Sequence, residues 1–270
     1  MIDSAVILAA SSNFANREIT ISRPHAMLPA LGKPMVVRVM ERLYRAGIRR
    51  YNVILGMNDG HVASYLNRQW MPDATFEFTL QSQETLLLLL HRIAKKLDAP
   101  FLIASHNSFT YERFVQSLLR HHEEQPNHLL LAGARLSLSA AKPRVYATVS
   151  DEKVSIHREI DTENDHFILG EHMLCGRHCV EYLTQLNESD FSQNGLTFFD
   201  VVQAYASQED AQLAIAETSW LLDVVQDSDL LTLNKRLLED SNDGHILSEL
   251  HSSVRVIPPV RVDPQVSVGQ

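Results

Sequence analysis

Short apolar runs alternate with stretches of helical periodicity along most of this chain. The first run, residues 5–10 (AVILAA), is wholly apolar, as expected of a strand buried on both faces of a parallel sheet. Further strands are predicted at residues 51–55, 75–80, 100–104, 127–134, 167–174 and 220–225. Helices are predicted at residues 34–46, 61–68, 84–97, 111–122, 177–186, 199–207 and 228–238. This alternation predicts an α/β domain over residues 1–240 with a mainly parallel sheet.

Local signals sharpen two parts of this prediction. Pro34 suits the first turn of the helix at residues 34–46, and Gly47 suits the position just after its end. Tighter alternation over residues 144–160 predicts a β-hairpin around residues 151–152.

Residues 241–270 form a separate C-terminal extension with a different pattern. Valines recur there every six residues, as at Val256, Val262 and Val268. A six-residue repeat indicates the start of a parallel β-helix. The alternative is an edge strand with alternating valines and two prolines, and the pattern alone leaves both open.

Composition and charge exclude several function classes. The net charge of −9 argues against a nucleic-acid partner, which usually requires a basic face. No segment approaches the ~20 apolar residues that span a bilayer, and the N-terminus lacks the basic flank of a signal peptide. The two cysteines, Cys175 and Cys179, fit a reducing compartment. We therefore expect a cytoplasmic protein with neither a nucleic-acid nor a membrane partner.

Several motifs resemble those of the sugar-1-phosphate nucleotidyltransferases, also called sugar-nucleotide pyrophosphorylases. The matches are LAA at residues 8–10, MLP at 27–29, GKP at 32–34, and Trp220 with the pairs at 223–224 and 229–230. The resemblance implies a nucleotidyltransferase-like, Rossmann-like α/β fold: a mixed, mainly parallel sheet with flanking helices and a left-handed β-helix beginning in the extension. It also implies a reaction in which a sugar 1-phosphate and a nucleoside triphosphate give a nucleotide sugar and pyrophosphate, with magnesium.

The same resemblance assigns site residues by position. The residues placed at the nucleotide are Ala10, Ser11, Ser12, Asn13, Gln81 and His106. Those placed at the sugar phosphate are Arg158, Glu159 and Gly170. Catalytic roles would fall to His25, Arg17 and Asp223, and metal ligation to Asp223 and His106.

Many of these positions lack the chemistry that the reaction needs. The family's two loop glycines fall on Ser11 and Asn13, where side chains hinder close backbone approach to a phosphate. Its arginine falls on Ala15, with Arg17 two residues further on. Its lysine falls on His25, and a neutral imidazole replaces an ammonium poorly.

The residues at the metal and sugar positions also differ from the family's pattern and also lack the expected chemistry. The first metal aspartate falls on His106, although magnesium prefers carboxylate, while Asp223 is retained. The sugar-binding Glu-Lys pair falls on Arg158 and Glu159, which reverses the order of charges. Transition-state charge would therefore be stabilised weakly.

Three hypotheses follow for function. The first is a catalytically impaired pseudoenzyme that acts as a regulatory or assembly subunit, or as a sensor of a nucleotide or sugar phosphate. It would need no cofactor, and it would form a homo-oligomer or a complex with an active homologue. The second is an active nucleotidyltransferase with magnesium and shifted residues. The third is a binding module for an unrelated small molecule.

Two groups of residues resemble metal ligands, and each also has a purely structural explanation. His25, His106 and Asp223 would suit zinc, nickel or iron better than magnesium if they converge, or else they line an empty cleft. The stretch HMLCGRHC at residues 172–179 has the wrong spacing for a usual zinc motif, and its cysteines suit a buried position better.

Overall fold

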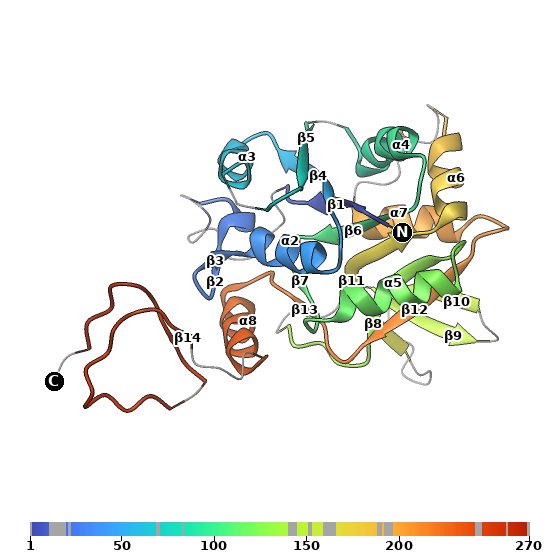
Figure 1. The fold of residues 1–270 in the computed structure, drawn as a ribbon. Helices are drawn as coiled ribbons and strands as arrows, with labels where there is room; N and C mark the ends of the chain where they lie inside the picture. Colours follow the sequence, from blue (N-terminus) through green and yellow to red (C-terminus); the bar gives the residue numbers. More distant parts are fainter. Residues whose placement is uncertain are drawn as a thin grey trace.

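A computed structural model describes residues 2–10, 20, 23–68, 71–82, 84–139, 145–150, 153–158, 166–187, 191, 197–240, 245–257 and 259–268. In this part of the chain, a nine-stranded sheet forms the centre of the molecule (Figure 1). Its strands run in the order β10-β9-β11-β6-β1-β4-β5, with β8 beside β11 and β12 beside β8. The bounds of these strands are β1 Ser4–Leu8, β4 Arg50–Gly56, β5 Thr75–Gln81, β6 Phe101–Ser105, β8 Leu129–Ala134, β9 Tyr146–Ser150, β10 Lys153–His157, β11 His166–Cys175 and β12 Leu213–Thr218.

Parallel and antiparallel pairs divide this sheet. β1 pairs in parallel with β4 and β6, β4 with β5, and β8 with β12. The long strand β11 is antiparallel to β6, β8 and β9, and β9 and β10 form the predicted hairpin. The mixed, mainly parallel α/β fold expected from the sequence is therefore confirmed.

Helices cover both faces of the sheet. The first hydrophobic core includes side chains from α2 (Met35–Arg45), α3 (Gly60–Leu66), α5 (Phe114–Glu124) and α8 (Asp227–Asp240). The second includes side chains from α4 (Leu86–Leu97), α6 (Arg177–Gln185) and α7 (Phe198–Ala206). After α2, Gly47 has a φ of 104°, a left-handed conformation that glycine adopts at little cost, as its predicted position requires.

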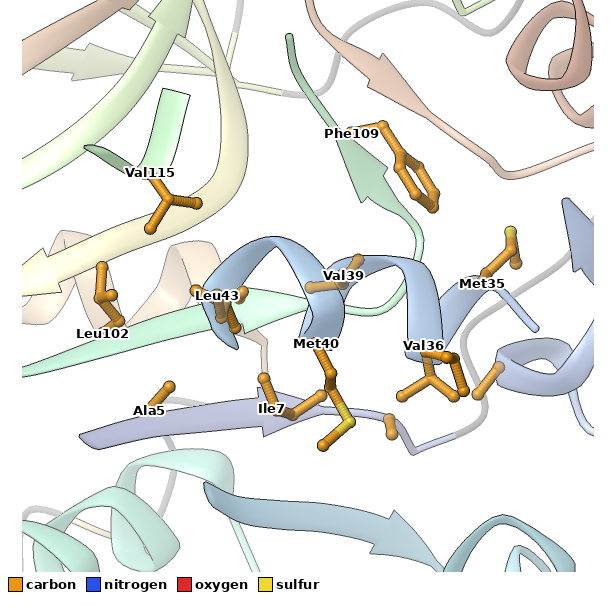
Figure 2. Close-up of a cluster of buried hydrophobic side chains, with 14 of the residues drawn as sticks. Ala5, Ile7, Met35, Val36, Val39, Met40, Leu43, Leu102, Phe109 and Val115 are labelled. Atoms are coloured by element: carbon orange, nitrogen blue, oxygen red, sulfur yellow. The ribbon is translucent and has the colours of Figure 1, made fainter. Parts of the chain in front are cut away.

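Alternate residues of β1 contribute to the two cores. Figure 2 shows Ile7 of β1 and Met40 of α2 pointing toward each other, with Ala5 on the same face of the strand. Val6 belongs instead to the second core, together with Ile54 of β4. Burial on both faces explains why the first run of the sequence is apolar throughout, and each such aliphatic side chain contributes ~1.5–3 kcal/mol on burial.

Short strands complete the frame around the sheet. They are β2 (Pro29–Ala30), β3 (Lys33–Pro34), β7 (Ser108–Phe109) and β13 (Leu222–Asp223), and η1 (His25–Met27) is a short 3-10 helix. The predicted strand at residues 220–225 is confirmed only at Leu222–Asp223. The sequence prediction also missed β12, which pairs in parallel with β8 from Leu213 to Thr218. Its two alanines have low strand propensity, so its apolar run did not stand out.

The C-terminal extension pairs with itself. β14 (His245–Ile246) and β15 (Arg261–Val262) form a separate parallel two-stranded sheet. In the described residues, the extension therefore adds no strand to the large sheet. Parallel pairing of successive segments is the arrangement of a β-helix, whose handedness and further coils remain predictions.

The extension contacts the α/β domain at Gly32. A Cβ atom at Gly32 would lie 2.9 Å from Nη2 of Arg261, and Gly32 has a φ of 71°. Glycine thus permits both the turn between β2 and β3 and the close approach of the extension. The domain boundary at residue 240 remains a prediction. Among the described residues, no helix is both long enough and apolar enough to span a membrane.

Candidate functional site

The carboxyl ends of three parallel strands meet at one edge of the sheet. β1 lies between β6 and β4, so the residues that follow these strands come together. The amide of His106 donates to the carbonyl of Leu8 at 3.0 Å, and that of Ala9 donates to the carbonyl of Ile54 at 2.9 Å. This is the edge where ligands bind in open α/β sheets.

The predicted nucleotide loop is represented here by Ala10, which directly follows Ala9. Ser11, Ser12 and Asn13 lie outside the described residues, as does Arg17. Their assigned roles therefore remain predictions.

His25 and His106 contact each other directly at this edge. Nδ1 of His25 lies 3.1 Å from Nε2 of His106, and the two rings meet edge to face. His25 comes from η1 and His106 from the turn after β6, and both are almost completely buried. The structure thus brings together the positions that the resemblance assigned to a lysine and to a metal-binding aspartate.

The hydrogen bonds fix the tautomers of this histidine pair. Nδ1 of His106 lies 2.8 Å from the carbonyl of Leu8, which can only accept, so this nitrogen carries a proton. Burial lowers the pKa of His106 to about 4, although the bond to Leu8 and the charge of Asp59 oppose the shift. Burial, then the nearby His106, lowers the pKa of His25 to about 3. Both rings are neutral at pH 7, so the Nδ1–H group of His25 donates a hydrogen bond to Nε2 of His106.

This bonding leaves His106 unsuited to bind a metal. One ring nitrogen donates a proton and the other accepts one, so neither offers a lone pair in this arrangement. In the part of the chain that the structure describes, no three histidine, cysteine, aspartate or glutamate side chains are grouped to hold a metal ion. The assignment of Asp223 and His106 as metal ligands remains a prediction.

Asp223 lies on the short ladder beside this pair. It is opposite Ser108 in the antiparallel pairing of β13 with β7. Asn107 fixes this ladder, because its carbonyl accepts from the amide of Val224 at 2.8 Å. Ser105 in turn donates to Oδ1 of Asn107 at 2.6 Å. Asp223 is therefore held close to the turn that carries His106.

Sequence reasoning missed Asp59, a buried carboxylate that acts on His106. Its Oδ2 accepts from the amide of Gly56, the last residue of β4, at 2.9 Å. Its negative charge raises the pKa of His106 against the larger effect of burial. The available signal was its place directly after a buried strand, at the same edge as the turn after β6.

A leucine side chain packs closely against Gly170, the glycine assigned to the sugar phosphate. A Cβ atom at Gly170 would lie 2.5 Å from Cδ2 of Leu221 and 3.3 Å from Oγ of Ser108. Leu221 follows Trp220 and is fully buried. Its backbone is fixed by bonds with Leu136 and Leu138. The residue after the tryptophan is thus a leucine packed over Gly170.

Among the described residues, Arg158 and Gln81 contact other parts of the chain. Arg158 is exposed and forms an ion pair with Asp200 at 2.6 Å, and Glu159 lies outside the described residues. Gln81 ends β5, and its side-chain amide donates to the carbonyl of Glu84 at 3.4 Å.

Most of the HMLCGRHC stretch is buried, namely residues 172–176 and Cys179. His172 is buried, its pKa is lowered to about 3 by burial and then by Arg42, and its ring meets Phe114 edge to face. Cys175 and Cys179 are buried thiols, and burial raises the pKa of Cys175. The buried alternative for these cysteines is confirmed.

Comparison with solved structures identifies the fold. A protein described as a glucose-1-phosphate thymidylyltransferase, from Bacillus anthracis, superposes with a TM-score of 0.71 over 89% of this chain and 97% of that one, at 16% identity. A UDP-glucose pyrophosphorylase complexed with UDP-glucose gives a TM-score of 0.69 over 88% and 99% of the two chains, at 12% identity. The chain therefore has the fold of the sugar-1-phosphate nucleotidyltransferases, as its motifs predicted.

Comparison of sequences points to a different kind of relative. The chain is 25% identical over 235 residues to translation initiation factor eIF2B subunit gamma from Dictyostelium discoideum. The aligned region covers 82% of this chain and 51% of that protein. It is 28% identical over 104 residues to eIF2B subunit epsilon from Schizosaccharomyces pombe, covering 37% and 15%. The chain thus spans about half or less of these relatives. No family model matches it.

Proposed function

We propose that this chain is a nucleotidyltransferase-fold subunit of a regulatory assembly that does not catalyse nucleotidyl transfer. The neutral, hydrogen-bonded pair of His25 and His106 carries the proposal. Nucleotidyl transfer develops negative charge on phosphate oxygens, which cations and metal ions must stabilise. A buried pair without charge supplies no cation, and both ring nitrogens of His106 are already engaged in hydrogen bonds.

Two further contacts support the loss of chemistry. Leu221 packs over Gly170, the glycine assigned to the sugar phosphate. The charge of Arg158, assigned to the same ligand, is already paired with Asp200. Both of these assigned residues thus already have partners within the chain.

The sequence relatives support a role in assembly. Both are named as subunits of a translation initiation factor, and proteins built from subunits bury surface between chains. We propose that this chain acts in the cytoplasm and associates with a second copy or with another nucleotidyltransferase-fold chain. Magnesium would matter only if catalysis were retained, with Asp223 as its carboxylate ligand.

The proposal is tested by assaying pyrophosphate release from nucleoside triphosphates mixed with sugar 1-phosphates and magnesium. We expect no release above the protein-free blank. In parallel, calorimetric titration with the triphosphates shows whether the cleft still binds nucleotide as a sensor. Sustained release that is lost in Asp223→Asn would overturn the proposal and establish an active enzyme.

A further inference from the structure

Two adjoining hollows form one groove beside α6. The larger has a volume of about 820 Å³ and the smaller about 460 Å³. Both are lined by Tyr182, Gln185 and Gln208, so they lie next to each other; we call them together the α6–α7 groove. α6 lies on the side of the molecule opposite the C-terminal extension (Figure 1).

Helix geometry explains how the groove is built. His178, Glu181, Tyr182 and Gln185 recur at the spacing of one face of α6. The facing wall comes from the C-terminal end of α7 and the residues that lead into β12, which are Tyr205, Gln208, Glu209, Asp210, Ala211 and Gln212. Leu87, Leu186 and Ala204 give the smaller hollow an apolar part.

The groove carries negative charge that the chain does not neutralise locally. Glu181, Glu209 and Asp210 line the larger hollow, whose lining includes neither lysine nor arginine. Within the described residues, these three carboxylates form no ion pair. Because α7 ends at this wall, the negative end of its helix dipole adds to the potential.

Two tyrosines form an aromatic surface within the groove. The rings of Tyr182 and Tyr205 lie 5.5 Å apart with an interplanar angle of 60°. Tyr205 is buried, and its hydroxyl accepts from the amide of Gln212 at 3.2 Å, which fixes the ring. Tyr182 is half-buried, so part of its ring is open to a ligand. A guanidinium group binds favourably to such a ring face.

We propose that the α6–α7 groove binds a short, arginine-containing basic segment of a partner protein. Its volume matches known ligand sites and exceeds the needs of a single ion. Its charge repels phosphates, so nucleotides and nucleic acids do not fit. Carboxylates would bind the cationic groups, the partly exposed ring of Tyr182 would contact a guanidinium plane, and the apolar part would contact the aliphatic stems. This site is independent of the histidine pair and of the proposed loss of catalysis.

The test is fluorescence anisotropy with a fluorescein-labelled hexa-arginine peptide at about 0.15 M salt, where distant charges are screened. The groove variant is Glu181→Gln, Glu209→Gln and Asp210→Asn together. The matched control is Glu123→Gln, Glu124→Gln and Glu249→Gln, exposed carboxylates elsewhere that give the same change in net charge.

We expect saturable binding to the unaltered chain, weakened about tenfold or more in the groove variant and less than threefold in the control. Tyr182→Leu should weaken binding of hexa-arginine more than that of hexa-lysine, since the planar guanidinium gains more from an aromatic face. Equal weakening in groove and control variants would show unspecific charge attraction and overturn the proposal, as would an absence of saturable binding. Thermal unfolding of each variant confirms that it is folded.

Discussion

Nδ1 of His25 donates a hydrogen bond to Nε2 of His106, 3.1 Å away, and both rings are neutral. The positions come from separate parts of the chain, 81 residues apart, yet both are almost inaccessible to water. Two adjacent buried positions can hold two neutral groups or two opposite charges, but a single unpaired charge there lowers the stability of the fold strongly.

The pair should therefore respond non-additively to charged substitutions. We expect His25→Lys and His106→Asp each to lower the free energy of unfolding by ~3–5 kcal/mol, because each buries one uncompensated charge. The double variant should be more stable than the sum of the single effects predicts, by about 1 kcal/mol or more. Urea unfolding of all four proteins at pH 7 measures this coupling, and strictly additive losses would contradict it.

Acid should destabilise the fold before the carboxylates titrate. The folded pKa values of His25, His106 and His172 are about 3, about 4 and about 3, below the value of 6.5 for a free histidine. The unfolded chain thus binds more protons below pH 6.5, so stability is full above that pH and falls as pH decreases.

Between pH 7 and pH 5, each of these histidines should cost up to ~2 kcal/mol of stability. His172→Gln should remove one such contribution and flatten the dependence. Urea unfolding at several pH values provides the measurement. A free energy of unfolding that stays constant over this range would show that these rings are not neutral and buried.

Gly170→Ala should be destabilising by ~1–3 kcal/mol, because the new methyl group would meet Cδ2 of Leu221 at 2.5 Å. Leu221→Ala alone should cost ~2–5 kcal/mol through the cavity that it leaves. In the double variant, the alanine at 170 should add little further loss. Thermal unfolding of the three variants tests this, and full additivity would mean that the two side chains do not compete for the same space.

Asp200 should matter more to stability than its ion-pair partner Arg158. Asp200 accepts from the amide of Thr197 at 3.0 Å and completes a capping box at the start of α7. Asp200→Ala should therefore cost ~0.5–2 kcal/mol. Arg158→Gln should cost less than ~1 kcal/mol because Arg158 is exposed. Equal losses in chemical unfolding would show that the ion pair outweighs the cap.

The sequence predicted the elements that have a simple periodicity. β1, β4 and β6 are short apolar runs, and burial on both faces of a parallel sheet produces such runs. β12 was missed because alanines pack in a strand without a distinctive pattern. Two-residue strands such as β7 and β13 are defined by their partners, which pattern alone does not reveal.

The site was predicted only in outline. The motif resemblance placed His25, His106 and Asp223 in one region, and the structure confirms that His25 and His106 meet. Periodicity and spacing gave no sign of their hydrogen bond, of the effect of Asp59, or of Leu221 above Gly170. Each of these depends on contacts between segments far apart in sequence, which only the folded chain brings together.

The buried histidine pair also has an evolutionary consequence. Placing the lysine and aspartate of the resembled enzymes at these two positions requires two substitutions, and either one alone places an unpaired charge in a nearly water-free position. The intermediate would be less stable than both end points. Single charged substitutions at either position should therefore be disfavoured, so we expect the two positions to change together.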